Sequence, residues 1–437
     1  MTALTIRKQA ALRGRVCVPG DKSISHRALL LGALADGDSR VRNFLPSGDC
    51  RATLDALRAL GVEIERYGDT MLAVHGRGLR GLHPPPGGSL DCVRSGTTMR
   101  LLAGILAGQR FDCTLTGDPQ LLRRPMRRIA EPLRRMGAAI DDADGYAPLA
   151  VRGTDLHGFD HTLSVASAQV KSALLLAGLY AGGPTVVRQC GPARDHTELM
   201  LSAMGAAIQI DGLDVTLSPP AALRPLSIDV PGDMSSASFL LVAAALVPGS
   251  QVTIEGVNVN PTRTGLLDVL SDMGAEIALS NERIQNNEPL ADLTAQSSSL
   301  AAVQVRGDTV VRGDTVVRMI DEFPILAVAA TQARGQTIVR DARELRVKET
   351  DRIATVVEEL SRMGADIVPR DDGFIVTGPT PLRGAVVDSH GDHRLAMALA
   401  IAGLVAEGET VVQNTDCIAD SFPGFQDVLF ELTDRHG

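Results

Sequence analysis

The sequence predicts an α/β protein built from six repeated units, and two recurrent patterns support this fold class. The first pattern is a helix end followed by glycine and the start of a strand, and it occurs five times. The second is a helix rich in alanine and leucine with few interior charges, and it occurs six times. Recurrence of such patterns along one chain is typical of repeated supersecondary units.

The helix-to-strand pattern places a glycine where each helix is expected to stop. Glycine adopts left-handed backbone conformations without strain, and the alternating apolar residues that follow it favour a strand. The glycines lie 76, 68, 69 and 90 residues apart, and a helix expected at Gln426–Leu432 would close a sixth unit. The five copies are Leu60–Ile64, Met136–Ile140, Met204–Ile208, Met273–Ile277 and Met363–Ile367.

The six apolar helices are expected to be buried nearly all round, because charges rarely interrupt them. They are Ser25–Ala35, Thr97–Ala107, Gln169–Ala181, Ser236–Val247, Phe323–Gln332 and His393–Ala406. Polar residues that can cap a helix lie at the start of each. A single polar start indicates simple capping, but six alike favour a site for anions, since helix N-termini carry free N–H donors and partial positive charge.

Two segments interrupt the regular spacing. Val305–Val310 is followed at once by a near-identical hexapeptide, Val311–Val316, just upstream of Asp321. We expect this tandem duplication only to lengthen a surface loop or edge hairpin, where insertions cost little. The polar segment Asn281–Ser299 is expected to be turn-like and part of the same irregular stretch.

Composition restricts the class of protein and of partner. The 437 residues include 44% hydrophobic residues and carry a net charge of −9, from 43 basic and 52 acidic side chains. This balance excludes a disordered or fibrous chain and predicts two or three domains. An acidic chain disfavours nucleic-acid and membrane-surface partners, since both reward positive charge. The sequence shows no signal peptide and no apolar run of about 18 residues, so we expect a cytoplasmic location.

Six scattered cysteines contain no CxxC pair, which indicates reduced structural thiols rather than a metal or redox motif. His390 and His393 have a spacing that a metal could use, but no third ligand with suitable spacing accompanies them. We therefore predict no metal and no cofactor. No dinucleotide, Walker or serine-hydrolase motif is present either.

Lysines are rare, because only four of the 43 basic residues are lysine. Lys22 and Lys348 lie in polar clusters beside helix starts, where an ammonium group can grip phosphate or transfer a proton. Lys8 fits a solvated surface residue, and for Lys171 a site role and a solvated surface position stay equally open. Asp321, which precedes an apolar helix, and Glu349 are candidate proton carriers, although Asp321 could also act only as a cap.

Four arginines at helix starts could hold carboxylate or phosphate groups through bidentate hydrogen bonds. They are Arg27, Arg124, Arg352 and Arg394. Each alone would be read as a surface charge. Together they indicate a site for a small molecule with several negative charges.

Several strings in this sequence resemble the hallmarks of the 5-enolpyruvylshikimate-3-phosphate (EPSP) synthase family, in order from residue 15 to about residue 430. The Ser167–Ser172 string is similar to a bacterial branch often associated with reduced glyphosate sensitivity. The strings are Pro19–Arg27, Ser95–Arg100, Arg124–Pro125, Arg346–Arg352 and Asp392–Arg394.

The resemblance implies an inside-out α/β barrel of two domains, each built from three repeated units of strands and helices. We expect residues 1–19 and 233–437 to form one domain and residues 20–232 the other. In the family the active site lies in the cleft between the domains, with the buried helices pointing their N-termini into it. A monomer is expected.

The implied reaction transfers the enolpyruvyl group of phosphoenolpyruvate to the 5-hydroxyl of shikimate 3-phosphate and releases phosphate. Glyphosate would be a competitive inhibitor. By resemblance, Asp321 would take the hydroxyl proton, and Lys348 and Glu349 would manage protonation at the methylene carbon. Lys22 would contact both substrates.

The other implied roles concern binding. Residues that would bind shikimate 3-phosphate are Lys22, Ser23, Arg27, Ser167, Ala168, Gln169, Asp321 and Lys348. Residues that would bind phosphoenolpyruvate are Lys22, Gly96, Arg124, Gln169, Arg352 and Arg394, with Gly96 allowing close approach because it lacks a side chain.

Three features depart from the family pattern. Arg94 stands where asparagine is usual, Ala193 replaces a hydroxyl residue and puts one phosphate contact in doubt, and the duplication adds six residues before Asp321. We hypothesise that Arg94 and the insertion alter affinity for phosphoenolpyruvate or an inhibitor rather than abolish activity.

Two alternatives stay open. One is the sister transferase that acts on UDP-N-acetylglucosamine, which typically carries a reactive cysteine aligned near Gln120–Arg124, where this chain has none. The other is a non-catalytic anion-binding relative, against which Lys22, Asp321, Lys348 and Glu349 argue.

Overall fold

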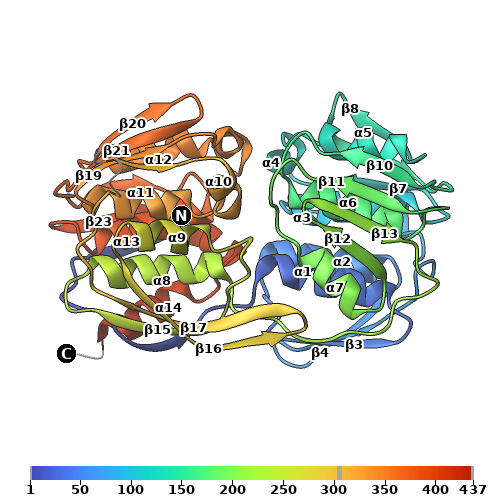
Figure 1. The fold of residues 1–437 in the computed structure, drawn as a ribbon, viewed down its shortest axis with the longest axis horizontal. Coiled ribbons are helices and arrows are strands. Elements are labelled where there is room, and N and C mark those ends of the chain that lie inside the picture. Colours follow the sequence, from blue (N-terminus) through green and yellow to red (C-terminus); the bar gives the residue numbers. More distant parts are fainter. Residues whose placement is uncertain (1, 303–307, 435–437) are drawn as a thin grey trace. The chain divides into compact units, whose positions relative to one another are not determined.

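The computed structural model describes residues 2–302 and 308–434, and its chain divides into two compact units (Figure 1). The first unit comprises Met1–Pro19, Pro231–Arg283 and Pro289–Gly437, and the second comprises Gly20–Val230 and Ile284–Glu288. The chain passes into the second unit after Pro19, returns to the first unit at Pro231 and contributes Ile284–Glu288 to the second. The domain boundaries expected from the sequence stay a prediction.

The second unit contains three four-stranded sheets in its described residues, each with one parallel pair followed by two antiparallel pairs. The first sheet has the order β14 (Ser227–Asp229), β3 (Asp38–Arg42), β5 (Leu72–His75), β4 (Glu63–Arg66). The second is β6 (Ser89–Asp91), β7 (Cys113–Thr116), β9 (Tyr146–Arg152), β8 (Ala139–Ala143). The third is β10 (Phe159–Thr162), β11 (Thr185–Arg188), β13 (Asp214–Ser218), β12 (Ala207–Asp211).

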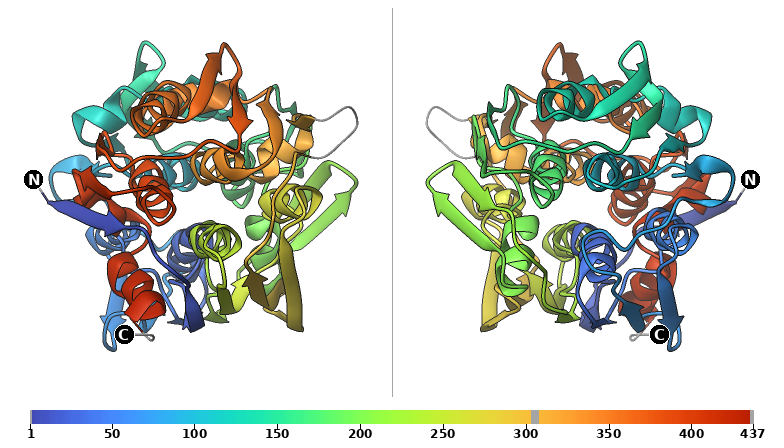
Figure 2. Two further views of the ribbon diagram at one scale, coloured as in Figure 1. Left: turned by 90° about the vertical axis from the view of Figure 1, so that its left-hand side faces the viewer. Right: turned by 90° about the vertical axis from the view of Figure 1, so that its right-hand side faces the viewer.

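Three buried helices lie inside these sheets, and Figure 2 views them nearly end-on. They are α1 (Lys22–Leu34), α3 (Gly96–Ala107) and α6 (Ala168–Gly178). Amphipathic and short helices complete the unit: α2 (Gly48–Ala59), η1 (Pro86–Gly88), α4 (Pro119–Leu122), α5 (Arg127–Arg135) and α7 (His196–Ala203).

The first unit repeats this plan with three further sheets in the part of the chain that the structure describes. One sheet is β16 (Glu276–Gln285), β17 (Glu288–Gln296), β15 (Gln251–Asn258), β2 (Arg13–Cys17), and another is β18 (Asp308–Val311), β19 (Gly335–Val339), β21 (Gly373–Gly378), β20 (Asp366–Arg370). The third has three strands: β1 (Ala3–Arg7), β23 (Glu409–Gln413), β22 (Val386–Asp388).

The first unit also has three buried helices, α8 (Met234–Leu246), α11 (Phe323–Gln332) and α13 (His393–Gly403). Its remaining helices are α9 (Gly265–Asp272), α10 (Asp314–Arg318), η2 (Arg343–Val347), α12 (Arg352–Arg362), η3 (Thr415–Asp420) and α14 (Phe425–Asp434). Each unit has its own hydrophobic core, and every residue of each core belongs to one unit. Among the described residues, no helix is long and apolar enough to span a membrane.

The predicted six-unit α/β fold is confirmed. All five helix-stop glycines have left-handed φ angles of +86°, +100°, +88°, +86° and +90°, so each occupies the conformation that glycine adopts at lowest cost. All six predicted apolar helices form, with ends that differ from the expected ones by a few residues.

The expectation for Asn281–Ser299 was wrong, because most of this segment forms the hairpin of β16 and β17. Asn286 and Asn287 form its turn with φ angles of +51° and +65°. Asparagine tolerates these angles, which two-residue hairpin turns of this hand require. Polarity misled the prediction because β16 is a mostly exposed edge strand.

The duplicated hexapeptide is not simply a surface loop. Its first copy begins outside the described residues, and Asp308 starts β18, which pairs in parallel with β19. In the second copy Val311 ends that strand and Gly313 turns the chain with a φ of +62°, so that α10 begins at Asp314. Val311 and Val316 are only 2% and 3% exposed. Their burial shows that the second copy packs into the unit instead of forming a surface loop.

Candidate active site

The structure places the predicted residues in two sets, one in each unit. In the second unit, α1 carries Lys22, Ser23 and Arg27 within its first two turns. Asp21 caps this helix, because its carboxylate accepts a hydrogen bond from the Ile24 amide at 2.9 Å. The cap fixes the start of α1 and therefore the backbone positions of these three residues.

Lys22 is mostly buried, with 15% of its side chain exposed. Its ammonium group forms an ion pair with the carboxylate of Asp49, in the first turn of α2. An anionic ligand could compete with Asp49 for this ammonium group.

The guanidinium group of Arg27 is almost completely buried and is held by uncharged groups. It donates to the Thr197 hydroxyl at 2.7 Å, to the Ser172 hydroxyl at 2.7 Å and to the Ser23 carbonyl at 3.0 Å. Burial lowers the pKa of Arg27 to about 10, although the carboxylate of Glu198 opposes the shift. Arg27 therefore stays charged at neutral pH, and its direct partners leave that charge unneutralised.

The start of α3 brings four further groups together. A side-chain carbon added at Gly96 would lie 2.8 Å from Nη1 of Arg100 and 3.1 Å from Nη1 of Arg124. Glycine is therefore needed for the two guanidinium groups to approach the helix start this closely. Arg100 also donates to the Gln169 side chain at 2.6 Å, and Gln169 donates to the Thr97 hydroxyl at 3.0 Å.

The start of α6 carries the remaining predicted residues of this unit. Ser167 is its N-cap and accepts a long hydrogen bond of 3.5 Å from the Val170 amide, and Ala168 and Gln169 follow as its first two residues. All three predicted residues are partly exposed, so this helix start remains open to a ligand.

Lys171, whose role the sequence left open, is buried in an ion pair. It is 1% exposed and lies 2.5 Å from the Glu198 carboxylate, which is also 1% exposed. Its ammonium group donates to the Ala193 carbonyl at 3.1 Å. Burial raises the pKa of Glu198 and Lys171 opposes that rise. Lys171 thus acts within the core, and Ala193 contributes through its backbone.

Two arginines that sequence reasoning passed over belong to this set. Arg194 donates to the Ser23 hydroxyl at 3.3 Å, and Arg100 is 1% exposed and bonded to Gln169. Arg100 ends the Ser95–Arg100 string, and Arg194 directly follows Ala193. The high arginine content hid them, because sequence alone gives no sign of which arginine turns inward.

In the first unit, Asp321 lies in the turn before α11, at the centre of three cations. One carboxylate oxygen lies 3.5 Å from Nζ of Lys348 and 3.4 Å from Nη1 of Arg352. The other oxygen lies 3.7 Å from Nη2 of Arg394. The Asp321 side chain is 14% exposed, so it is partly shielded from water.

Arg352 is the most deeply buried of these cations, with 1% of its side chain exposed. It donates to Asp392 at 2.7 Å and to Glu349 at 2.6 Å. Burial alone would lower the pKa of Arg352, but the carboxylates of Asp392, Glu349 and Asp321 raise it above the ordinary value. Arg352 is therefore a permanent cation that ties these carboxylates together.

Lys348 follows η2 and has 17% of its side chain exposed. Burial lowers the pKa of Lys348 and the positive charge of Arg352 adds to this effect, while Asp321 and Glu349 oppose it. A lysine with a lowered pKa gives up its proton more readily, as a general acid requires.

Asp392 positions Arg394 by capping α13. Its carboxylate accepts hydrogen bonds from the Arg394 amide at 2.9 Å and from the Arg352 side chain at 2.7 Å. Burial would raise the pKa of Asp392, yet Arg352 more than compensates and lowers it. The cap and the ion pair thus join the starts of α12 and α13.

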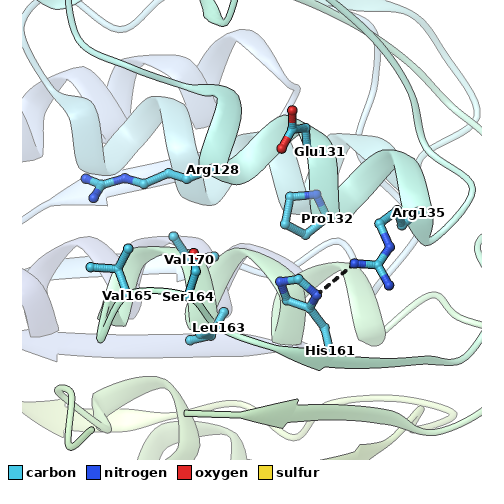
Figure 3. Close-up of a pocket in the computed structure, with 9 residues that line it drawn as sticks. All are labelled: Arg128, Glu131, Pro132, Arg135, His161, Leu163, Ser164, Val165 and Val170. Atoms are coloured by element: carbon cyan, nitrogen blue, oxygen red, sulfur yellow. Dashed lines mark hydrogen bonds between the residues drawn. The ribbon is translucent and has the colours of Figure 1, made fainter. Parts of the chain in front are cut away.

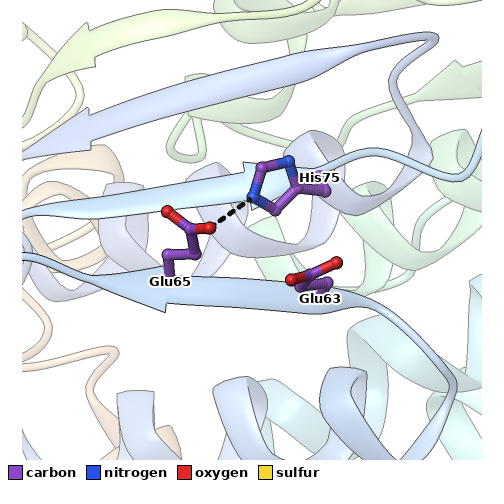
Figure 4. A group of neighbouring side chains, drawn as sticks. All are labelled: Glu63, Glu65 and His75. Carbon is purple, nitrogen blue, oxygen red and sulfur yellow. Dashed lines mark ion pairs between the residues drawn. The ribbon is translucent and has the colours of Figure 1, made fainter.

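Within the part of the chain that the structure describes, two groups of side chains outside these sets have the composition of a metal site. Figure 4 shows Glu63, Glu65 and His75 on β4 and β5, where His75 pairs with Asp38 at 2.9 Å and with Glu65 at 3.6 Å. The second group consists of Glu358, Glu359 and His390. His390 pairs with Glu359 at 2.7 Å. In both groups the histidine is engaged by carboxylates, and neither group indicates a role in the site.

Figure 3 shows a pocket of about 140 Å³ in the second unit, beside the helix that follows Arg124. At one end Arg135 donates to the His161 ring at 3.4 Å. Burial lowers the pKa of His161, and the charge of Arg135 adds to the effect. Val170 of α6 lines the pocket, but no residue of the predicted site does.

The fold and the two sets of residues can now be compared with known proteins. Residues 6–429 match the family described as EPSP synthase (3-phosphoshikimate 1-carboxyvinyltransferase). The chain belongs to the EPSP synthase family. The resemblance stated from the sequence motifs is thereby confirmed, whereas the glyphosate-insensitive branch stays a prediction.

Curated relatives cover the chain almost end to end. A protein of Brevibacillus brevis named 3-phosphoshikimate 1-carboxyvinyltransferase is 51% identical over 98% of this chain and 100% of its own length. One of the same name from Roseiflexus castenholzii is 53% identical over 96% of each chain. A solved structure of EPSP synthase from Acinetobacter baumannii is 42% identical, with a TM-score of 0.88 over 99% of this chain and 98% of that one. The two-domain α/β fold of this family is therefore also that of this chain.

Proposed function

We propose that this protein transfers the enolpyruvyl group of phosphoenolpyruvate to the 5-hydroxyl of shikimate 3-phosphate, with release of phosphate. The relatives' names supply the reaction class. The observation that carries the proposal for this chain is the Asp321 carboxylate, which contacts Lys348, Arg352 and Arg394 within 3.7 Å. A candidate base thus lies beside a candidate acid and two cations suited to an anionic substrate.

The second unit would hold the substrates' anionic groups. Arg27, Ser23 and the start of α6 would receive shikimate 3-phosphate, because they combine an unneutralised cation with hydroxyl and amide donors. Gly96 and Arg124 would receive phosphoenolpyruvate, since the helix start and the guanidinium group lie against each other. Lys22 would exchange its contact with Asp49 for contacts to both substrates.

The first unit would perform the proton transfers of an addition followed by an elimination. Asp321 would accept the proton of the 5-hydroxyl while the hydroxyl oxygen bonds to the second carbon of phosphoenolpyruvate. Lys348, assisted by Glu349, would deliver a proton to the methylene carbon. Loss of a proton from the resulting methyl group and departure of phosphate would then restore the double bond. Arg352 and Arg394 would stabilise the anionic groups throughout.

One assay tests the function. The protein is mixed with shikimate 3-phosphate and phosphoenolpyruvate, and inorganic phosphate is measured. We expect release only when both compounds are present. Release with UDP-N-acetylglucosamine in place of shikimate 3-phosphate would identify the sister transferase instead, and no release with either would favour a non-catalytic relative.

The sister transferase typically carries a reactive cysteine, so the reactivity of the cysteines in this chain tests that alternative. The nearest cysteine to the expected position, Cys113, lies in β7 and is 3% exposed. Burial raises the pKa of Cys113 to about 12, so its thiol is not a nucleophile at neutral pH. This favours the shikimate 3-phosphate reaction.

A further inference from the structure

A strained loop precedes Gly96. Val93 has a φ of +51° and is 47% exposed, and its amide donates to the Asp91 side chain at 2.8 Å. A β-branched residue in the left-handed region is a genuine outlier. Such a conformation persists only where the surrounding structure holds it.

One residue, Asp118, holds this loop at two neighbouring positions. Its amide donates to the Val93 carbonyl at 2.8 Å, and its Oδ2 accepts from Nε of Arg94 at 2.8 Å. The side chains of Arg94 and Asp118 are 53% and 27% exposed. The ion pair is therefore accessible enough to change without disturbing the core.

Asp118 also organises the chain that leads to Arg124. Its Oδ1 accepts hydrogen bonds from the Gln120 and Leu121 amides at 3.0 Å and so caps α4. The Arg124 amide then donates to the Leu121 carbonyl at 3.0 Å. The same carboxylate thus contacts Arg94 of the strained loop on one side and, on the other, the start of α4, which leads to Arg124.

The two ends of this connection meet at Gly96. A side-chain carbon added there would lie 3.1 Å from Nη1 of Arg124, so the guanidinium group of Arg124 lies against the start of α3. We propose that the ion pair of Arg94 with Asp118 is a positioning contact that sets the spacing between the α3 start and Arg124 and thereby tunes affinity for phosphoenolpyruvate. This inference rests on the proposed function, since it assigns that substrate to Gly96 and Arg124.

Substituting either partner tests the contact. Arg94→Asn removes the cation, and Asp118→Asn removes the charge but keeps an oxygen able to cap α4, because asparagine caps helices as well as aspartate. We expect each to raise KM for phosphoenolpyruvate about two- to fivefold, the range for an exposed ion pair. KM for shikimate 3-phosphate should stay within about 1.5-fold, because Ser23 and Arg27 bind elsewhere. The double variant should resemble either single one, since both remove the same interaction.

Arg152→Asn is the matched control. Arg152 forms an exposed ion pair with Asp141 in the same unit, between β9 and β8, and its loss should leave both KM values unchanged. Amide hydrogen exchange of residues 91–97 supplies a readout that does not depend on activity. It should become faster in Arg94→Asn and stay unchanged in Arg152→Asn.

Val93→Gly sharpens the test by removing the strain that the ion pair opposes. In that background Arg94→Asn should change KM for phosphoenolpyruvate less than it does in the parent chain. The inference is overturned if both single variants keep the parental KM in an active enzyme, whether or not exchange accelerates. It is also overturned if KM values for both substrates rise equally. A parent protein that releases no phosphate would instead contradict the proposed function, and unchanged exchange would then reject the positioning contact separately.

Discussion

Arg27 of the second unit and Arg352 of the first unit are held in opposite ways. In the second unit Arg27 is surrounded by two hydroxyls and a carbonyl, so its charge remains for a ligand. In the first unit Arg352 contacts three carboxylates, those of Asp392, Glu349 and Asp321. Neutral partners suit a site that binds anions, whereas paired charges suit a site that moves protons. Together with the proposed function, the comparison predicts that binding depends mainly on the second unit and proton transfer mainly on the first.

The largest effect is expected from Asp321→Asn. If this substitution mainly weakened substrate binding, it would contradict the role in proton transfer predicted for the first unit. Removal of a general base costs about 10²- to 10⁴-fold in rate. We expect kcat to fall by this amount while KM for either substrate changes little. Asp366→Asn, on the exposed face of β20, is the control and should keep the parental kcat. Steady-state phosphate release measures both.

Lys171→Met tests how much the buried ion pair of Lys171 with Glu198 stabilises the second unit. It would leave the buried Glu198 carboxylate without its ion-pair partner, and breaking a buried pair costs about 3–5 kcal/mol. Urea unfolding should show this loss. Arg188→Met, which breaks exposed ion pairs with Asp160 and Asp214, should cost at most about 1 kcal/mol. Equal losses in the two variants would contradict the structural role of Lys171.

Gly96→Ala tests whether the second unit binds phosphoenolpyruvate and shikimate 3-phosphate at different places. The new methyl group must displace the Arg100 or Arg124 guanidinium group, which lie 2.8 and 3.1 Å away. KM for phosphoenolpyruvate should rise about tenfold, since displacing a binding group by 1 Å can cost up to 10²-fold. Inhibition by glyphosate should be measured alongside. A rise confined to shikimate 3-phosphate would place phosphoenolpyruvate elsewhere.

The smallest effect is the pH dependence of the parent protein itself. If Lys348 donates a proton, it must be protonated, and its lowered pKa means that it loses this proton below the ordinary value of 10.5. The rate should therefore fall on the alkaline side beginning below pH 10.5. Lys348→Arg should remove that limb along with most of the rate, because arginine does not titrate there. If the alkaline fall in rate were unchanged in that variant, it would come from a group other than Lys348.

Much of the fold could be predicted because glycine and apolar residues record local geometry. Gly61 and Gly137 occupy the left-handed conformation that their position after a helix predicted, and the apolar helices are buried as their composition indicated. The hairpin of β16 and β17 escaped prediction because an exposed edge strand is as polar as a loop. The structure of the second hexapeptide copy was not predicted, because it depends on contacts with neighbouring residues in the fold and not on the copy's own sequence.

The candidate site was recognisable mainly through motifs rather than through geometry. Asp321 and Lys348 could be singled out by rarity and position, and the family resemblance supplied their roles. The orientation of a side chain could not be predicted in the same way. Lys171 turns into the core toward Glu198, and Arg194 turns toward Ser23, although both lie in equally polar strings.

Calorimetric titration with shikimate 3-phosphate tests the central division of roles most directly. Asp321→Asn and Arg27→Gln should be titrated beside the parent protein and assayed for phosphate release. The account predicts that Asp321→Asn binds with nearly parental affinity yet releases almost no phosphate, whereas Arg27→Gln binds at least about tenfold more weakly, as expected when a charged hydrogen-bond donor is lost. Parental affinity in Arg27→Gln together with lost binding in Asp321→Asn would contradict it.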